Sequence, residues 1–349
     1  MPTDAIKHTY RSTLARCSDA SVASVLCTLL LACEHATPPT KDHLPGTPSS
    51  QHVAATNEGD MKAMAAGQLV HCAGACTPAL RAIQGRVEQL VGAYSAALLP
   101  SDCENLCTTI MAAAHLTASE LMEPALMSDN PLAGLAYAEA LLERAADADQ
   151  QAYAYLRIAQ HASALYDYDR AQRALECIAD DRTSERSENR TLEKNIELVS
   201  LQRERGDYQA AYRLIQAVLT QSIQHPGNRP LRAALISLAA KCAARAGDAE
   251  ATRRFLLDAA RVEVDRRFMD KSIEAAQNAL DNFDDYMAAA RRACAEHEKR
   301  KAFYRDLSRT GSFADIVRGR EAALQRPLTA VERVQLNNRI RSVNPRLNH

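Results

Sequence analysis

The chain has 349 residues, enough for two domains of average size or one extended array of repeats. Its 42 lysine and arginine residues balance 43 aspartate and glutamate residues, so the formal net charge of -1 excludes a polybasic nucleic-acid binder and an acidic disordered tail. With 65 alanines, 12 glycines, no tryptophan and 5% aromatic residues, the composition predicts an all-α fold.

Residues 1–32 have the layout of a secretory signal peptide. A basic start precedes the uncharged run 20–32, which is too short for a permanent membrane-spanning helix of about 20 residues. The run ends in Leu-Leu-Ala followed by Cys33, and this ending resembles the lipobox of bacterial lipoproteins. The resemblance implies cleavage before Cys33, a lipid on its thiol and, because glutamate follows it, the outer rather than the inner membrane.

The segment after this cysteine is rich in proline, threonine and serine. Over residues 33–57 it predicts a disordered, extended linker between a lipid anchor and the folded part. The alternative is a buried N-terminal helix that happens to end in cysteine.

An N-terminal helical region is predicted over residues 58–148. Prolines at positions 78, 100, 124 and 131 interrupt its apolar pattern. They separate four predicted helices, at 60–75, 79–98, 102–122 and 131–147.

Two CxxxC pairs fall within this region, Cys72 with Cys76 and Cys103 with Cys107. The intervening predicted helix separates the pairs by about 30 Å at 1.5 Å per residue. Disulfide-bonded cysteines need Cα atoms within about 7 Å, so bonds between the pairs are not expected. Ordinary packing, a disulfide within a pair and a metal site remain as alternatives, in that order, and no metal or cofactor is predicted.

Four segments between residues 149 and 296 repeat one pattern. Their anchors Tyr166, Gly206, Gly247 and Asp284 are separated by 40, 41 and 37 residues, and an aspartate follows each anchor. On either side, apolar residues recur at helical spacing. The pattern predicts four helical hairpins that turn at the anchors.

The turn sequence GDYQAA at 206–211, flanked by small residues, resembles the tetratricopeptide repeat. The period exceeds the 34 residues of that family, and two turns lack its glycine. A generic alanine-rich bundle is the alternative. The resemblance implies a solenoid whose first helices line a groove for a partner peptide or helix. Carried over by position, the groove residues are Tyr153, Leu156, Gln160, Glu193, Ser200, Arg203, Ser237, Lys241, Lys271 and Asn278.

Arg203, Lys241 and Lys271 would make this groove mildly cationic and suited to an acidic or carboxylate-ended peptide. The alternative is that the groove residues form ordinary solvated faces.

The C-terminal segment 297–349 carries 12 lysine and arginine residues against 5 acidic residues. Thr329 and Glu332 form a capping-box pattern that opens a last helix containing Arg333, Arg339 and Arg341. We expect a capping helix with a solvated basic side that lies against an acidic solenoid; a patch for an anionic partner is the alternative.

No phosphate-binding loop, dinucleotide fingerprint, zinc-protease motif or hydrolase elbow occurs in the sequence. We therefore expect no enzyme, but an envelope lipoprotein that acts as a protein-binding scaffold or adaptor. One alternative is an extracytoplasmic ligand-binding protein, transporter accessory component or surface adhesin. Another is a cytoplasmic repeat regulator whose N-terminus only mimics a signal.

Overall fold

The computed structural model describes residues 78–179, 185–222, 229–261 and 266–344. These residues contain 14 α-helices and no β-strand, which confirms the all-α prediction. The predicted signal peptide, the linker with Cys33 and the helix predicted at 60–75 lie outside the described residues.

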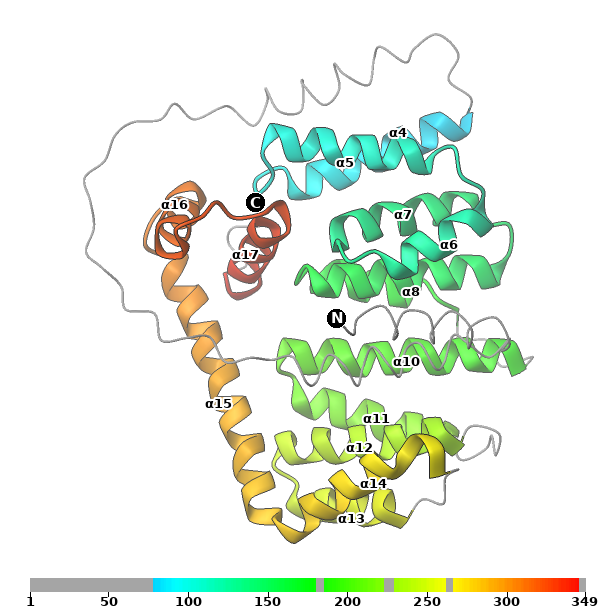
Figure 1. The fold of residues 1–349 in the computed structure, drawn as a ribbon, viewed down its shortest axis with the longest axis vertical. Coiled ribbons are helices and arrows are strands. Elements are labelled where there is room, and N and C mark those ends of the chain that lie inside the picture. The colour runs from blue at the N-terminus through cyan, green and yellow to red at the C-terminus, as the bar shows by residue number, and fades with distance from the viewer. Residues whose placement is uncertain (1–77, 180–184, 223–228, 262–265, 345–349) are drawn as a thin grey trace, which may run out of the picture. The chain divides into compact units, whose positions relative to one another are not determined.

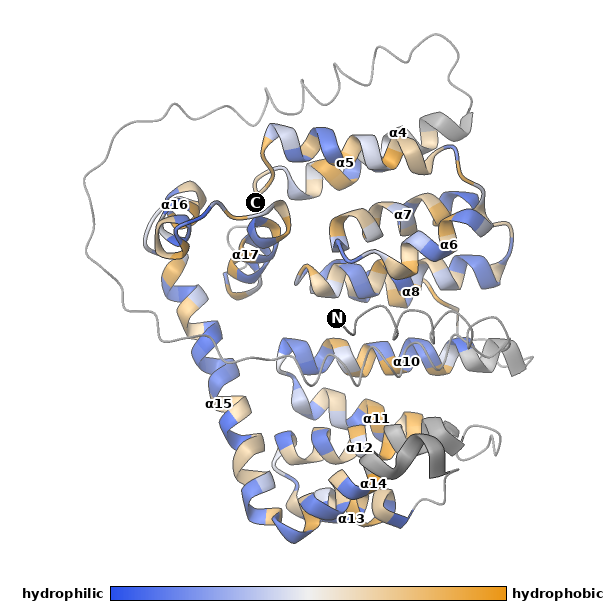
Figure 2. Ribbon diagram, viewed as in Figure 1, coloured by the Kyte–Doolittle hydropathy of each residue, from blue (hydrophilic) through white to orange (hydrophobic). Residues whose placement is uncertain are grey.

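The helices belong to two compact units, which are described separately. Residues 78–206 with 294–344 belong to the flanking unit, and residues 207–293 to the central unit. α15 (Phe283–Leu307) begins in the central unit and ends in the flanking unit, and much of it is hydrophilic (Figure 2). Residue 296, where the sequence predicts the last repeat to end, therefore lies inside a helix.

The flanking unit is built of successive helices that pack on one another. It contains α4 (Pro78–Tyr94), α5 (Pro100–Ala113), α6 (Ala118–Met127), α7 (Pro131–Arg144), α8 (Ala148–Ala164), α9 (Tyr168–Glu176) and α10 (Glu185–Arg205), then the end of α15, α16 (Phe313–Leu324) and α17 (Ala330–Val343). α6 packs on α7 and α7 on α8 (Figure 1). α8 also packs on α9, and α10 packs on both α8 and α9. One core of leucine, isoleucine and alanine side chains runs through these layers.

The boundaries of the N-terminal helices differ from the prediction. The helix predicted at 102–122 is two helices, because Thr117 caps α6 and exchanges hydrogen bonds with Glu120 in a capping box. Pro124, predicted as a break, lies inside α6. α4 ends at Tyr94 rather than at 98, and α7 ends at Arg144 rather than at 147.

The central unit repeats the same packing with fewer helices. It contains α11 (Tyr208–Ser222), α12 (Arg229–Ala246), α13 (Ala249–Arg261), α14 (Arg266–Asp281) and the start of α15. α11 packs on α12, α12 on α13 and α13 on α14. The buried residues between them include Ile215, Ala239, Ala243 and Leu256.

Three of the four predicted turns share one backbone geometry. Tyr166, Gly206 and Gly247 have φ angles of 60°, 82° and 85°, in the left-handed region. The aspartate after each one caps the next helix by accepting a hydrogen bond from the backbone N–H three residues later, at 3.1, 3.0 and 2.9 Å. The repeated aspartate in the sequence is therefore a helix cap at these turns.

The fourth turn differs from the prediction. α15 begins at Phe283, so Asp284 and Asp285 lie in its first turn rather than at a cap. Asn282 donates its backbone N–H to Asn278, and Tyr286 donates to Asn282, so helical hydrogen bonds continue almost through the connection. No left-handed residue is needed here.

The last helix begins at the predicted capping box of Thr329 and Glu332. Its arginines do not form a solvated basic side, contrary to the prediction. Arg333 is 6% exposed, forms an ion pair with Asp102 of α5 and donates a 3.1 Å hydrogen bond to the carbonyl of Ala97. Arg339 stacks on the ring of Tyr166. α17 is thus fixed to the flanking unit by its arginines.

Candidate functional site

The structure divides the predicted groove residues between the two units. Tyr153 and Gln160 lie on α8, and Ser200 and Arg203 on α10, all in the flanking unit; Ser237 and Lys241 lie on α12 and Asn278 on α14, in the central unit. The side chain of Lys271 lies outside the described residues. The contacts that the structure establishes belong to the flanking members, which form the candidate site.

On α8, three polar residues lie along one face. Tyr153, Arg157 and Gln160 are spaced i, i+4 and i+7, which places them on adjacent turns of a helix. The guanidinium of Arg157 lies 4.6 Å from the centre of the Tyr153 ring, and its Nη1 donates a 2.5 Å hydrogen bond to Gln160 Oε1. The three side chains therefore hold one another in place.

α10 carries a second polar stripe. Glu193, Glu197 and Ser200 are spaced i, i+4 and i+7, and Arg203 follows one turn later. Gln160 Nε2 donates a 2.5 Å hydrogen bond to Glu197 Oε1, which joins the two stripes. We call Tyr153, Arg157, Gln160, Glu193, Glu197, Ser200 and Arg203 the α8–α10 seam.

Burial dominates the electrostatics of the seam. Glu193 is 8% exposed, and loss of water raises its pKa to about 7, although the charge of Arg157 opposes the shift. Burial also raises the pKa of Glu197, against the hydrogen bond from Gln160. Near neutral pH, the carboxylates of Glu193 and Glu197 therefore bind protons more readily than solvent-exposed carboxylates do.

Several buried polar atoms of the seam have no hydrogen-bond partner among the described residues. These atoms are Nε of Arg157, Oγ of Ser200 and Nε of Arg203. Most buried polar groups in native proteins are hydrogen-bonded, because an unmade bond costs about 1–3 kcal/mol. The seam thus has hydrogen-bonding capacity that the described residues do not use.

Sequence reasoning missed two members of the seam and misplaced one neighbour. Arg157 lies one turn after Tyr153, and Glu197 one turn after Glu193, so helical spacing from the predicted positions would have found both. Leu156, predicted to line the groove, is 2% exposed and belongs to the core.

The seam is mixed in charge rather than cationic. Arg203 shares its helix with Glu193 and Glu197, and Arg157 faces them from α8. Lys241, on which the cationic prediction also depended, lies in the central unit. The groove residues of the flanking unit therefore no longer support the predicted preference for an acidic peptide.

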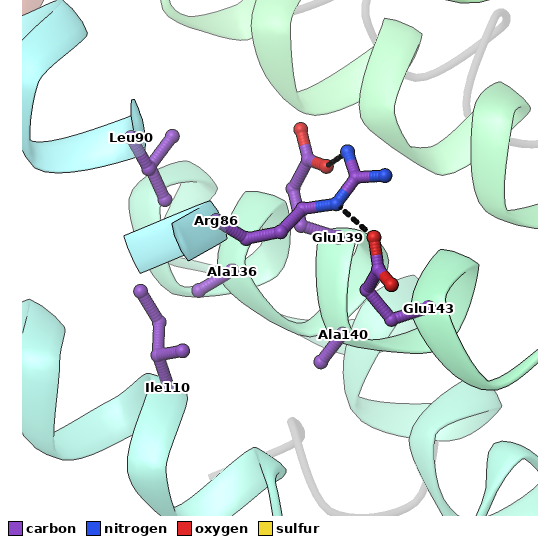
Figure 3. Close-up of a pocket in the computed structure, with 7 residues that line it drawn as sticks. All are labelled: Arg86, Leu90, Ile110, Ala136, Glu139, Ala140 and Glu143. Carbon is purple, nitrogen blue, oxygen red and sulfur yellow. Dashed lines mark hydrogen bonds and ion pairs between the residues drawn. The ribbon is translucent and has the colours of Figure 1, made fainter. Parts of the chain in front are cut away.

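A separate hollow lies between α4, α5 and α7 (Figure 3). Arg86 crosses it to form ion pairs with Glu139, at 2.8 Å, and with Glu143. Glu139 is 6% exposed and also pairs with Arg170 of α9. Leu90 and Ile110 close the hollow on its apolar side (Figure 3). The charged side chains here bind one another, so this network fastens helices together.

Cys103 and Cys107 lie one turn apart on α5, partly buried, and both carry free thiols. Burial raises the pKa of each thiol, which favours its protonated form. Cys72 and Cys76 lie outside the described residues. Within the described part of the chain, no three His, Cys, Asp or Glu side chains gather in a way that could hold a metal ion.

Comparison with protein-family models, with curated proteins and with solved structures found no match to this chain. No helix among the described residues has the length and apolar character needed to cross a membrane. Proposals about function therefore depend on the chain's own chemistry.

Proposed function

We propose that this chain is a non-catalytic protein-binding scaffold of the bacterial cell envelope, which binds a peptide or helix of a partner protein along the α8–α10 seam. The observation that carries the proposal is the joining of the polar stripes of α8 and α10 by the hydrogen bond from Gln160 to Glu197. Gln160, Ser200 and Arg203 are partly exposed, so these polar side chains can exchange hydrogen bonds with the N–H and C=O groups of a partner backbone.

A recurring contact between successive hairpins supports a tetratricopeptide-like framework for this binding. The guanidinium of Arg205 lies 5.9 Å from the centre of the Tyr168 ring. In the central unit, the guanidinium of Arg245 lies 5.4 Å from the centre of the Tyr208 ring. Both tyrosines follow a capping aspartate, so in these two cases the same kind of contact joins the start of the second helix of one hairpin to the end of the first helix of the next. Stacked hairpins of this kind present extended binding surfaces.

The seam is tested by photo-crosslinking in the native cells. A photoreactive phenylalanine analogue is placed at Gln160 or Ser200, with a control at Arg173, which is exposed on α9. We expect the same partner band from both seam positions and none from the control. Equal labelling from all three positions, or no band from the seam, contradicts the proposal.

The envelope location depends on Cys33, which we propose carries the lipid. Labelling with a palmitate analogue is expected in the wild type and lost in Cys33→Ala. Label that persists in the variant contradicts the anchor while leaving the binding proposal standing.

The alternative function, a ligand-binding protein, requires a closed apolar pocket. The Arg86 hollow of Figure 3 is occupied by ion pairs. The hollow beside α13 is open and lined by charged side chains of both signs. Neither favours that reading.

A further inference from the structure

The end of α15, α16 and α17 form a lobe with a core of its own. The buried residues of this core are Ile316, Leu328, Leu336 and Ile340. We call residues 297–344 the C-terminal lobe. Of its described residues, Val334 alone is a buried member of the core that runs through the other helices of the flanking unit, and Phe313, Ala330 and Val331 pack against that core while partly exposed. A segment with its own core can open as one cooperative unit.

Two side chains of α17 hold the end of α8. Gln335 Nε2 donates a 2.8 Å hydrogen bond to the carbonyl of Ala164. Asn338 Nδ2 donates a 2.9 Å hydrogen bond to the carbonyl of Leu165. The last carbonyls of a helix have no partner within it, so these donors supply partners that α8 itself lacks.

A third side chain, from α15, holds the end of α10. His297 Nε2 lies 3.1 Å from the carbonyl oxygen of Arg205 and donates a hydrogen bond to it. A Cβ at Gly206 would lie 2.3 Å from this nitrogen, so the contact needs glycine at the turn. The C-terminal lobe therefore holds the ends of both helices that carry the α8–α10 seam.

The seam is sensitive to the distance between these two helices. Gln160 lies one turn before Ala164, about 6 Å along the axis of α8. The 2.5 Å hydrogen bond from Gln160 to Glu197 is lost beyond about 3.5 Å, so a shift of about 1 Å between α8 and α10 breaks it. α8 packs more extensively on α7 than on α10, so its contact with α10 is the weaker of the two.

We propose that the C-terminal lobe regulates the α8–α10 seam. With the lobe docked, α8 and α10 keep the spacing at which the seam binds its partner. With the lobe undocked, this spacing is lost and the affinity for the partner falls. Since coupling between two equilibria is reciprocal, the bound partner also stabilises the docked lobe. The inference rests on the proposed function of the seam and names what controls that site.

The first measurement needs no partner. Gln335→Ala/Asn338→Ala removes both hydrogen bonds to α8, and hydrogen exchange is followed in the full chain. We expect exchange at the ends of α8 and α10 to become at least about threefold faster, although both substitutions lie on α17. Arg305→Ala/Arg318→Ala, at exposed positions of the same lobe, is the matched control and is expected to leave both ends unchanged. Exchange that is unchanged, or faster only in α17 and α8, overturns the proposal.

The second measurement follows the partner, with the photoreactive analogue at Ser200 in the native cells. The partner band is expected to weaken about fivefold or more in Gln335→Ala/Asn338→Ala. The same loss is expected in His297→Ala, which releases the lobe at α10 instead, and the control variant is expected to keep the band. Unchanged hydrogen exchange in α6 and α7 shows that the unit remains folded in each variant.

The outcomes separate this inference from the function on which it rests. A band of unchanged strength in both releasing variants overturns regulation by the lobe and leaves the binding role of the seam standing. A band that is absent already in the wild-type background contradicts the binding role, and the inference falls with it.

Discussion

The guanidinium of Arg339 lies 3.7 Å from the centre of the Tyr166 ring, and its Nη1 donates a 2.5 Å hydrogen bond to the hydroxyl of Tyr304. Tyr166 occupies the turn between α8 and α9, where the equivalent turns have glycine. The last helix of the chain thus uses the first of the repeated turns as its docking point.

Arg339→Ala is expected to loosen α17. A desolvated cation–π contact contributes about 2 kcal/mol, and the hydrogen bond to Tyr304 adds about 1 kcal/mol. Hydrogen exchange of α17 amides should become faster, with Arg339→Lys recovering only part of the protection because lysine lacks the planar donor fork. Arg318→Ala, on the exposed side of α16, serves as the control and should leave α17 unchanged. Unchanged exchange in Arg339→Ala contradicts the docking role.

The left-handed backbone conformation of Tyr166 leads to a second prediction, in which relief of backbone strain opposes loss of the stacked ring. A non-glycine residue in this conformation costs about 1–2 kcal/mol, so Tyr166→Gly relieves strain but removes the stacked ring. We expect Tyr166→Gly to destabilise the wild type and to be neutral or stabilising when Arg339→Ala is already present. Additive losses in the two backgrounds would show that the ring acts without the arginine.

The glycines of the next two turns are expected to respond differently to alanine. Both have positive φ, and a Cβ at Gly247 meets no atom within 4 Å, so Gly247→Ala should cost about 1 kcal/mol of strain. A Cβ at Gly206 would lie 2.3 Å from Nε2 of His297 and should displace this ring from the carbonyl of Arg205.

Thermal unfolding should therefore show a larger loss for Gly206→Ala than for Gly247→Ala. The double variant Gly206→Ala/His297→Ala should lose less than the sum of its single variants. Equal losses for the two glycines contradict the role of His297.

The three capping aspartates are expected to differ in how much they stabilise the fold. Asp207→Ala removes a helix cap and should destabilise by about 1 kcal/mol. Asp167→Ala and Asp248→Ala should cost more, because these carboxylates also accept hydrogen bonds from the hydroxyls of Tyr94 (2.9 Å) and Tyr212 (3.3 Å). Asp285→Ala, inside the first turn of α15, is the control and should change the free energy of unfolding by less than about 0.5 kcal/mol. A loss at Asp285 equal to the others contradicts this ranking.

Because the pKa of Glu193 is raised, we expect an unusual dependence of the free energy of unfolding on pH. Its pKa rises from 4.5 to about 7 on folding, so the folded state binds the proton more tightly than the unfolded state. This group therefore makes the folded protein less stable as pH rises from about 4.5 to about 7, by up to about 3 kcal/mol. Glu193→Gln should gain stability over the wild type at pH 8 and not at pH 4, measured by urea unfolding. A constant difference between the two proteins at every pH contradicts the shift.

Local chemistry made much of the fold predictable. The capping aspartates after Tyr166, Gly206 and Gly247, and the capping box at Thr329, act within one helical turn and are visible in the sequence. The break between α5 and α6 was also encoded locally, in the capping box of Thr117, but the run of apolar residues across it favoured one helix.

Long-range pairings had no such signal. The sequence offers no means to match Arg339 with Tyr166, or Arg333 with Asp102, because each pair joins residues far apart in the chain. The predicted groove residues were carried over by position from the tetratricopeptide resemblance, and their polar contacts depend on how α8 packs against α10.

The pairing of Arg333 with Asp102 also sets an order of events during synthesis. When α5 leaves the ribosome, its partner has not been translated, and more than two hundred residues must follow before the ion pair can form. The nascent chain therefore lacks this ion pair until α17 has been translated, and a truncation that removes α17 leaves Asp102 without it.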